Sequence, residues 1–361
     1  MKILHVETGR HLYGGPQQVL YLCSGLARLG VDSVLVCPPA SGVAEAAARA
    51  KIRTITVGCA GDFDLRFGWR LKQLLADERP DIVHCHSRRG ADSLGGLAAK
   101  LAGIPAVLSR RVDNPESGLL AKLRYRPYVR VVAISTTIAG ILEQAGVERR
   151  KIVVIRSAVD AAHFPEVPDC GRFHREFRIE PDHFVIAAAA QFIERKGHRY
   201  LLEAVAALRP RYPKLRVVLF GQGPLQRVLK ARCAELGIAD IVQFAGFRRD
   251  LDEYLGCIDI LVHPALQEGL GVITLKAQAA GVPVVGFRAG GLSEAVLHGE
   301  TGLLVPTGDS EALADAIARL ADDNRLRHRY GATARQRMRA EFTIEGMAEQ
   351  HLSLYKSILN G

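Results

Sequence analysis

The sequence has little of what marks membrane-spanning, exported or nucleic-acid-binding proteins. No apolar run approaches the roughly 18–20 residues that a bilayer span requires, and the opening MKILHV is too short for an export signal before Glu7 interrupts it. Aromatic residues make up only 6% of the chain and form no stacking platform, and no nucleic-acid recognition motif is present. We therefore expect a cytoplasmic protein without a nucleic-acid partner.

Paired cysteine motifs are also missing. The seven cysteines have no C-x-x-C spacing, and their number is odd. This pattern predicts reduced thiols in a cytosolic protein, most of them buried as small apolar residues.

The composition and the charge indicate what the chain does contain. Its 361 residues are 48% hydrophobic and 24% charged, which is typical of a globular protein with two domains. The net charge is +10, and residues 1–160 hold 23 lysines and arginines against 14 acids, a difference of +9. This bias favours an anionic partner such as a nucleic acid, an acidic membrane surface or a phosphorylated substrate, although a solvated basic surface is the alternative. Because no nucleic-acid motif is present, a nucleic acid is the least favoured of these partners, and an anionic membrane surface or a phosphorylated substrate is favoured.

Short β-branched runs alternate with helix-length stretches along the whole chain. In the first half the runs are KILHV, SVLVCP, IRTITV, DIVHCH, AVLS, RVVAIS and KIVVIR. After a break near AAHFPEVPDCGRF the pattern restarts with FVIAAAAQ, LRVVLFG, IVQFAG, DILVHPA, VPVVGF and TGLLVP. The alternation predicts the α/β class, with two doubly wound, Rossmann-like domains built on parallel sheets.

We place the two domains at residues 1–165 and 166–342. The last helical stretch, residues 343–361, is expected to pack back onto the first domain. Two such domains facing each other would leave a central cleft between the carboxyl ends of their strands, where ligands bind in sheets of this kind.

Glycine-rich turns follow predicted strands in both halves. Gly14–Gly15 come after KILHV, and Pro16 suits the first position of the helix that follows. Such a turn lets a phosphate or sugar approach backbone amides at a helix N-terminus, although two glycines also suit a plain tight turn. In the second half Gly221 and Gly223 of GQGP end a strand in the same way, and the repetition predicts a ligand rim.

Histidines and charged residues follow other strands. His84 and His86 of DIVHCHSRRG lie on the same side of an extended chain, and we expect His86 to face a ligand and His84 to be structural. A metal would need further ligands, and none is spaced nearby, so we predict no metal and no other cofactor. Arg195 and Lys196 of ERKG can hold a diphosphate as a fork and a point charge, or can lie in a solvated loop. Glu268 precedes a Gly-x-Gly turn that opens a helix, where its carboxylate can accept sugar hydroxyls.

In their order and spacing these elements resemble the family 4 retaining glycosyltransferases of the GT-B fold. The resemblance covers almost the whole chain through the GG turn, DIVHCHS, VVAIS, KIVVIRSAVD, ERKG, GQGP, FAGF, EGLG…GVPVV, GG…E and TGLLV. It implies transfer of a sugar from a nucleotide-diphosphate donor, with retention of the anomeric configuration and without a bound metal.

The resemblance also implies roles for individual residues. The catalytic set is His86 near the reacting sugar, Arg195 and Lys196 on the leaving diphosphate, and Glu268 on the donor sugar. The donor-binding residues are Gly14, Gly15, Gly221, Gly223, Phe247, Gly269, Leu270, Gly271, Val272 and Lys276. The acceptor side is assigned to Arg88, Arg89, Arg110 and Arg111.

Two departures from the family pattern bear on the donor. The second glutamate of the E-x7-E motif, which is the usual ribose ligand in the family, is Lys276 here, and Ala190–Gln191 replace a usual arginine. An ammonium donates to ribose hydroxyls or to a phosphate but does not accept hydrogen bonds as a carboxylate does. Lys276 either contacts the donor nucleotide or extends to the edge of the cleft without a role.

Together these observations predict a hexosyltransferase. The expected donor is a nucleotide sugar, with UDP-sugars favoured, and the expected acceptor is a glycolipid or a lipopolysaccharide-core or O-antigen saccharide at the inner face of the plasma membrane. The alternatives are a non-catalytic nucleotide-sugar-binding or scaffold protein and a GT-B-like phosphorylase or epimerase.

Overall fold

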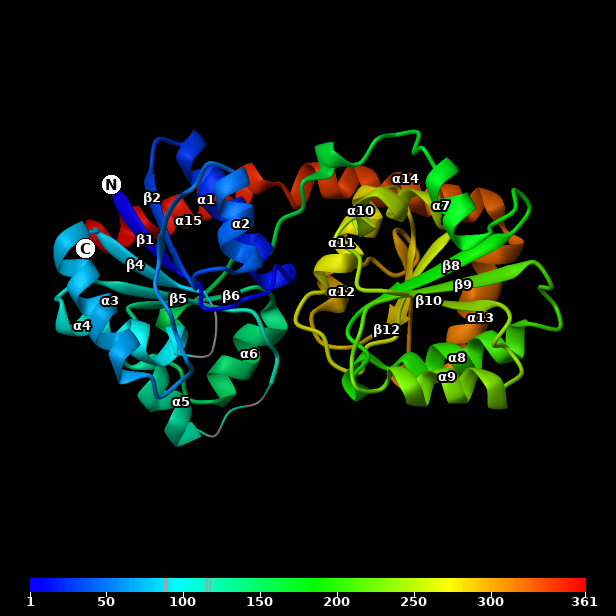
Figure 1. Ribbon diagram of the computed structural model, residues 1–361, viewed down its shortest axis with the longest axis horizontal. Coiled ribbons are helices and arrows are strands. Elements are labelled where there is room, and N and C mark those ends of the chain that lie inside the picture. Colours follow the sequence, from blue (N-terminus) through cyan, green and yellow to red (C-terminus); the bar gives the residue numbers. More distant parts are fainter. Residues whose placement is uncertain (87–89, 115, 117) are drawn as a thin grey trace. The chain divides into compact units, whose positions relative to one another are not determined.

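The computed structural model describes residues 1–86, 90–114, 116 and 118–361. The chain forms two compact domains, a first domain of Met1–Ala158 with Ile344–Gly361 and a second domain of Val159–Thr343 (Figure 1). The boundary lies between Ala158 and Val159, before the boundary predicted at residue 165. The amide of Val159 donates to the carbonyl of Phe342 at 2.8 Å, and this hydrogen bond ties the linker to the second domain.

The first domain is built on a parallel sheet with the strand order β3-β2-β1-β4-β5-β6-β7. Its strands are β1 (Lys2–Val6), β2 (Asp32–Cys37), β3 (Arg53–Thr56), β4 (Ile82–Cys85), β5 (Ala106–Arg110), β6 (Arg130–Ala133) and β7 (Ile152–Val154). Its helices are α1 (Gly14–Arg28), α2 (Gly42–Arg49), α3 (Leu65–Glu78), α4 (Gly96–Leu101), α5 (Gly118–Tyr125), α6 (Thr136–Gln144) and α15 (Ile344–Leu359).

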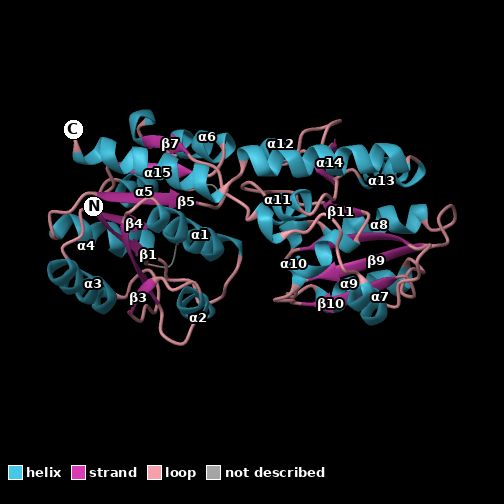
Figure 2. Ribbon diagram, turned by 90° about the horizontal axis from the view of Figure 1, so that it is seen from above, coloured by secondary structure: helices cyan, strands magenta, loops and turns pink. Residues whose placement is uncertain are grey.

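The second domain has its own parallel sheet, with the strand order β10-β9-β8-β11-β12-β13. Three of its strands, β9, β10 and β11, are labelled in Figure 2. Its strands are β8 (Phe184–Ala189), β9 (Leu215–Phe220), β10 (Val242–Gly246), β11 (Ile260–His263), β12 (Val284–Phe287) and β13 (Gly302–Val305). Its helices are α7 (Gly171–Phe177), α8 (His198–Leu208), α9 (Gln226–Glu235), α10 (Leu251–Tyr254), α11 (Val272–Ala279), α12 (Leu292–Ala295), α13 (Ser310–Asp322) and α14 (Asn324–Glu341). Each apolar run named from the sequence forms a strand, so the predicted fold class is confirmed.

The helix α15 belongs to the first domain although it comes last in the chain. Its side chains Met347 and Tyr355 are buried in one core cluster with Leu22 of α1. A Cβ atom at Gly25 would lie 2.7 Å from the Cβ of Ala348, so the glycine allows α1 and α15 to approach closely.

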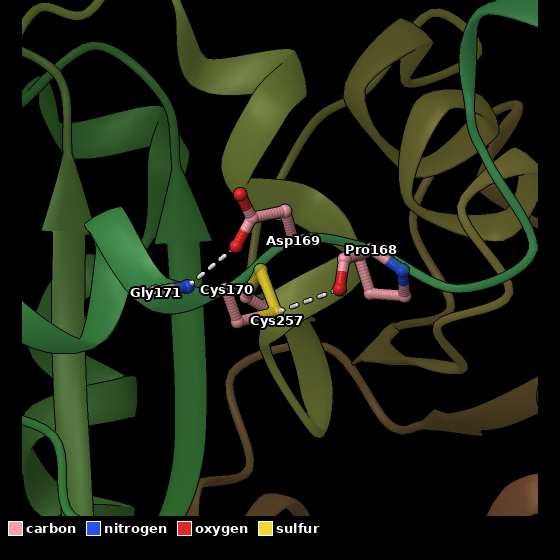
Figure 3. Close-up of a disulfide and its surroundings, with 5 residues drawn as sticks. All are labelled: Pro168, Asp169, Cys170, Gly171 and Cys257. Atoms are coloured by element: carbon pink, nitrogen blue, oxygen red, sulfur yellow. Dashed lines mark hydrogen bonds between the residues drawn. A yellow bond between two sulfur atoms is a disulfide. The ribbon is translucent and has the colours of Figure 1, made fainter.

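A disulfide joins Cys170, immediately before α7, to Cys257, with the two sulfur atoms 2.12 Å apart (Figure 3). The prediction of reduced thiols is therefore wrong for this pair. The two cysteines are 87 residues apart in sequence and meet only through the fold, so their spacing gives no signal. The free cysteines of the described chain are Cys23, Cys37, Cys85 and Cys233, which are buried, and Cys59, which is half-buried. A cavity of about 800 Å³ lies beside the disulfide, next to the residues that precede β8, β11 and β12.

An apolar surface is exposed around the start of α3. Phe63 is 95% exposed, Leu65 75% and Trp69 62%, whereas most large apolar side chains of the domain are buried. Arg66 and Arg70 lie exposed on the same helix. We call these five residues the α3 surface. Among the helices that the structure describes, none is long and apolar enough to cross a membrane.

Candidate active site

Loops that follow five strands of the second sheet are joined by backbone hydrogen bonds at its carboxyl edge. The amide-to-carbonyl bonds run from Gly221 to Gly246, from Phe192 to Gln222, from Leu266 to Arg195 and from Gly291 to Glu268. Because parallel strands end at the same edge, these bonds connect the loops after β8, β9, β10, β11 and β12 into one rim. The repeated glycine turns of the sequence thus lie together.

Glycine is required at two points of this rim. Gly221 has a φ of +137°, and a Cβ atom there would lie 2.0 Å from the carbonyl oxygen of Ala190. Gly290 has a φ of +53°, and a Cβ atom there would lie 2.2 Å from the carbonyl oxygen of Glu268. Any larger residue would push the loops apart, so Gly221 allows the loop after β9 to lie against Ala190, and Gly290 sets the position of the Glu268 backbone.

The carboxylate of Glu268 is held by two side chains. Its Oε2 accepts hydrogen bonds from Lys196 Nζ at 2.7 Å and from His263 Nε2 at 2.6 Å. Its Oε1 accepts from the amide of Gly269 at 3.1 Å. Lys196 comes from the turn after β8, His263 ends β11, and Glu268 lies in the loop between β11 and α11. Three segments therefore meet at one carboxylate.

This arrangement keeps Glu268 ionised. Burial alone raises the pKa of the carboxyl group, but the hydrogen bonds and charges of His263 and Lys196 outweigh it and hold the pKa well below the ordinary value of 4.5. An ionised carboxylate accepts hydrogen bonds only. The group is thus suited to receive the hydroxyls of a sugar and unsuited to act as a general acid.

The neighbouring sequence-predicted residues lie on the same rim. Gly197 follows Arg195 and Lys196 with a φ of +66°, and a Cβ atom there would lie 1.9 Å from the carbonyl oxygen of Pro264. Gly271, with a φ of +86°, directly precedes α11, whose first residue is Val272; Leu270 is fully buried. Amides at the start of this helix are available to an anion or a sugar hydroxyl. Phe247 follows β10 and is 46% exposed, and a Cβ atom at Gly223 would lie 2.5 Å from the carbonyl oxygen of Phe192.

Lys276 on α11 forms an ion pair with an acid on a neighbouring helix. Its Nζ bonds both carboxylate oxygens of Asp252 on α10, at 2.7 Å and 3.0 Å. No pattern in the sequence indicates this partner.

In the first domain the structure corrects the start of the first helix. The helix α1 begins at Gly14 and contains both glycines, whereas the sequence placed Pro16 at its first position. The first amides of a helix need no partner within it, so two glycines and a proline can form its first turn. The Cδ of Arg111 would lie 3.7 Å from a Cβ atom at Gly15, which places this arginine beside the turn.

His86 belongs to a buried histidine cluster that the sequence revealed only in part. Its Nε2 lies 3.0 Å from Nδ1 of His5 on β1. The ring of His84 lies 3.9 Å from that of His86, and its nitrogens contact Tyr355 Oη at 2.6 Å and Ser109 Oγ at 2.9 Å. His84 therefore links β4 to β5 and to α15.

The histidines of the cluster are neutral. Burial is the main cause that lowers the pKa of His5 to about 3, and the electrostatic effect of His351 on α15 is the second cause. Burial likewise lowers the pKa of His351 to about 4. The pKa values of His84 and His86 are lowered well below 6.5 by burial and by neighbouring histidines. Ring nitrogens of His5, His84 and His86 lie within 4.8 Å of one another, which could suit a metal ion. Both nitrogens of His84 already have hydrogen-bond partners, however, and the charge of Arg111 acts on the cluster, so a cation would be opposed there.

Of the other arginines predicted for the acceptor side, the structure describes Arg110 only. Arg110 is buried, and its guanidinium bonds Glu116 at 2.8 Å and the carbonyls of Val112 and Asn114 at 2.8 Å and 2.6 Å. It orders its own loop, and these contacts leave it little capacity for an acceptor. Arg88 and Arg89 lie outside the described residues.

Sequence reasoning missed His5, Asp252, His263 and Tyr355. His263 is the last residue of a predicted strand, five positions before Glu268, and this position was a usable signal. His5 and Tyr355 in the first domain and Asp252 in the second meet their partners only through the tertiary fold of each domain.

Comparison with known proteins agrees with this geometry. Residues 171–337 match the family model "Glycosyl transferases group 1", and residues 13–163 match "Glycosyltransferase Family 4". The chain is 27% identical to the lipopolysaccharide core biosynthesis glycosyltransferase LpsE of Rhizobium meliloti, over 99% of both chains. It is 33% identical to a D-inositol 3-phosphate glycosyltransferase of Corynebacterium efficiens, over 76% of this chain and 70% of that one.

The fold is likewise shared with solved structures. The crystal structure of HepE from Anabaena in complex with UDP-glucose superposes with a TM-score of 0.89 at 20% identity, over 99% of this chain and 100% of that one. With both halves of the chain matched by glycosyltransferase models and with two Rossmann-like domains, the protein belongs to the family 4 glycosyltransferases of the GT-B fold.

Proposed function

We propose that the enzyme transfers a hexose-type sugar from a UDP-sugar to a glycolipid or lipopolysaccharide-core saccharide, with retention of the anomeric configuration. The observation that carries the donor assignment is the contact of Lys196, His263 and Glu268 on the glycine rim. It sets a cation for a diphosphate next to a carboxylate for sugar hydroxyls. HepE, which shares the fold, was crystallised with UDP-glucose, and LpsE is named for lipopolysaccharide core synthesis; both support the proposal.

Arg195 and Lys196 neutralise the negative charge that develops on the leaving diphosphate. Glu268 and the amides of residues 270–272 orient the sugar. The acceptor hydroxyl attacks the anomeric carbon on the face from which the diphosphate departs. The bond to the diphosphate oxygen breaks, the bond to the acceptor oxygen forms, and the acceptor proton passes to the diphosphate. Glu268, held by Lys196 and His263, is not proposed as the nucleophile, and the reaction is proposed to need no metal.

We assign the acceptor to the first domain, with His86 and Arg111 at its site. The same domain is proposed to rest on an anionic membrane through the α3 surface. This surface combines exposed aromatic and aliphatic side chains with two exposed arginines, and such a combination favours the boundary of an anionic lipid layer. The enzyme would then act as a peripheral protein at the cytoplasmic face.

Titration calorimetry with UDP, GDP and ADP tests the donor assignment, and proton NMR of the glycoside formed from the matching sugar nucleotide tests retention. We expect UDP to bind at least tenfold more tightly than the other two, and the product anomer to match the donor. Tighter binding of GDP or ADP would overturn the choice of nucleotide, and an inverted anomer would overturn retention. A protein that binds all three without turnover would be a nucleotide-binding scaffold instead.

A further inference from the structure

The cavity beside the disulfide lies at the edge of the second sheet opposite the glycine rim. Its walls are the residues that precede β8, β11 and β12, the linker before α7, and one side of α14. Because the strands are parallel, these residues mark the amino edge of the sheet, whereas the rim follows the carboxyl ends. The strand β11 connects the two, since Asp259 precedes it in the cavity wall and His263 ends it beside Glu268. We call this space the amino-edge cavity, and it is separate from the proposed donor site.

Two glycines bring α14 close to this edge. A Cβ atom at Gly331 would lie 2.0 Å from the carbonyl oxygen of Gly281, and a Cβ atom at Gly281 would lie 2.9 Å from Nη2 of Arg335. The helix lies beside α11 in both ribbon views (Figures 1 and 2). The guanidinium of Arg335 therefore packs on the turn between α11 and β12, at the wall of the cavity.

Two of the three acids in the wall are already paired with arginines of α14. The carboxylate of Asp259 lies 3.3 Å from Arg327 and accepts a hydrogen bond at 2.8 Å from a backbone amide of β8. Glu166 in the linker lies 3.3 Å from Arg339. The third acid, Glu180, is exposed. The two pairs therefore use the charges of Arg327 and Arg339 at least in part, and leave none for the remaining arginine.

Arg335 is that remaining arginine, and its partners are neutral. Its Nη2 donates to the carbonyls of Pro165 at 3.1 Å and Ala280 at 2.5 Å. Its buried Nε has no hydrogen-bond partner, and none of the described acids forms an ion pair with it. Burial, followed by the charge of Arg339, lowers the pKa of Arg335 from its ordinary value of 12.5. A half-buried cation beside a second cation is stabilised by an anion, which the fold itself does not supply.

The positions of the two arginines favour a phosphate. Arg335 and Arg339 are one helical turn apart and share a face of α14, so one group can contact both. Guanidinium groups bind phosphate and carboxylate oxygens through charge-assisted hydrogen bonds. A phosphate monoester carries up to two negative charges and three free oxygens, and a carboxylate carries one charge and two oxygens. The phosphate therefore matches a pair of arginines better.

The rest of the wall indicates that the ligand is larger than a phosphate ion. Apolar parts of Pro168, Ile258, Val282 and Pro283 line the cavity, and Figure 3 shows Pro168 beside the disulfide. The volume is about 800 Å³, within the range of roughly 300–1,000 Å³ that is usual for small-molecule sites. The wall thus suits an anionic group joined to an apolar body.

We propose that the amino-edge cavity binds a small organic phosphate, with the phosphate on Arg335 and Arg339 and the apolar body against Pro168 and Val282. The bound molecule joins the linker, α14 and the turn after α11. This is a second ligand site of the domain, and it can be filled while a nucleotide sugar occupies the proposed donor site at the other edge of the sheet.

Titration calorimetry with phenyl phosphate tests the proposal, and the rise in Tm with ligand concentration provides a second readout. Phenyl phosphate should bind about tenfold or more tightly than inorganic phosphate, benzyl alcohol or benzoate, because each of these lacks the apolar body, the charge or the phosphate. Saturating UDP should leave the affinity for phenyl phosphate within about twofold of its value without UDP, because the two sites are separate.

Substitutions on α14 locate the binding. Arg335→Gln should weaken phenyl phosphate about tenfold or more, as expected when hydrogen bonds from a charged group are lost. Arg339→Gln changes a side chain that is 47% exposed, so it leaves the packing of Arg335 intact and should weaken binding about threefold. Arg325→Gln, an exposed arginine of the same helix outside the cavity wall, is the matched control and should leave the affinity unchanged. Thermal unfolding shows whether each variant is folded.

The outcomes that would overturn the proposal are distinct. If phenyl phosphate gives neither heat nor a rise in Tm at millimolar concentrations, or if UDP displaces it, the cavity is not a second phosphate site. Benzoate or benzyl alcohol binding as tightly as phenyl phosphate would contradict the phosphate class. Unchanged affinity in both folded arginine variants, or an equal loss in Arg325→Gln, would show that the two arginines do not hold the ligand. None of these results depends on which sugar nucleotide the enzyme uses.

Discussion

Lys196 Nζ lies 2.7 Å from Glu268 Oε2, so the cation and the carboxylate assigned to the donor neutralise each other in the absence of ligand. Neither charge is left uncompensated in the shielded site, and this lowers the cost of keeping both there. In the donor site that we propose, a sugar diphosphate gives Lys196 a second anionic partner and gives Glu268 hydroxyl donors. The pair is then one half of that proposed site, already formed by the fold.

Removing one partner of this pair should reduce turnover strongly. Lys196→Met removes the cation that we propose stabilises the leaving diphosphate, and we expect kcat to fall by about 10²–10³-fold. Glu268→Gln keeps the shape of the side chain but removes the charge, and it should raise KM for the donor as well as lower kcat. Steady-state kinetics with the sugar nucleotide identified by calorimetry measures both. The control is Arg199→Gln, which changes an exposed arginine at the start of α8. An equal loss of kcat in that variant would contradict the roles assigned to Lys196 and Glu268.

The lowered pKa of Glu268 predicts a pH-dependent contribution to stability. Ionised Glu268 stabilises the folded state at pH values above its unfolded pKa near 4.5, and this contribution is lost as the pH falls toward the lower pKa of the folded state. The difference in Tm between the wild type and Glu268→Gln should therefore be largest near neutral pH and shrink below about pH 4.5. A difference that stays constant over this range would show that the carboxylate is not the source.

The buried histidines should limit stability in mild acid. The pKa of His351 falls from 6.5 in the unfolded chain to about 4 in the folded protein, so the unfolded state takes up the proton first. Its contribution is fully present above pH 6.5, and each unit of pH between 6.5 and 4 costs about 1.4 kcal/mol. Urea unfolding from about pH 7.5 to pH 4 should show this loss, and His351→Gln should reduce its slope by about one proton. An unchanged slope would contradict the buried neutral state of His351.

The disulfide should contribute measurably to the second domain. It closes a loop over a sequence separation of 87 residues, for which the loss of chain entropy in the unfolded state predicts about 4–5 kcal/mol. Urea unfolding of the paired variant Cys170→Ser/Cys257→Ser should show this decrease against the non-reduced wild type. Alkylation of the unfolded protein should label five cysteines without a reductant and all seven after reduction. Seven labelled thiols before reduction would contradict the bond.

The single tryptophan of the chain reports on the α3 surface. Trp69 is 62% exposed, so its emission should shift to the blue when vesicles containing anionic phosphatidylglycerol are added, and salt should reverse the shift. Arg66→Gln/Arg70→Gln should weaken binding most at low salt. Val228→Ser, which removes an exposed apolar side chain from the second domain, should have no effect. No spectral change with anionic vesicles at low salt would contradict this docking surface.

Local patterns and tertiary contacts explain what the sequence could and could not predict. The β-branched runs predicted the strands because a continuous apolar run of strand length reflects burial between two layers of helices. The glycine turns and Glu268 could be assigned to a rim because parallel strands end at a common edge. The Asp252–Lys276 pair and the Cys170–Cys257 bond join distant segments, so neither has a periodic or spacing signal. The sequence could mark Lys276 as unusual but could not supply its partner.

The close packing of α15 on α1 determines which of the two domains can complete its core first during translation. Residues 1–158 emerge first but lack part of their own core until residues 344–361 have been synthesised, because Met347, Ala348 and Tyr355 fill that space. The second domain is continuous in sequence and can fold while the first still waits for its last helix. The face of α1 around Gly25 therefore stays uncovered through most of synthesis, until residues 344–361 have been added to the chain.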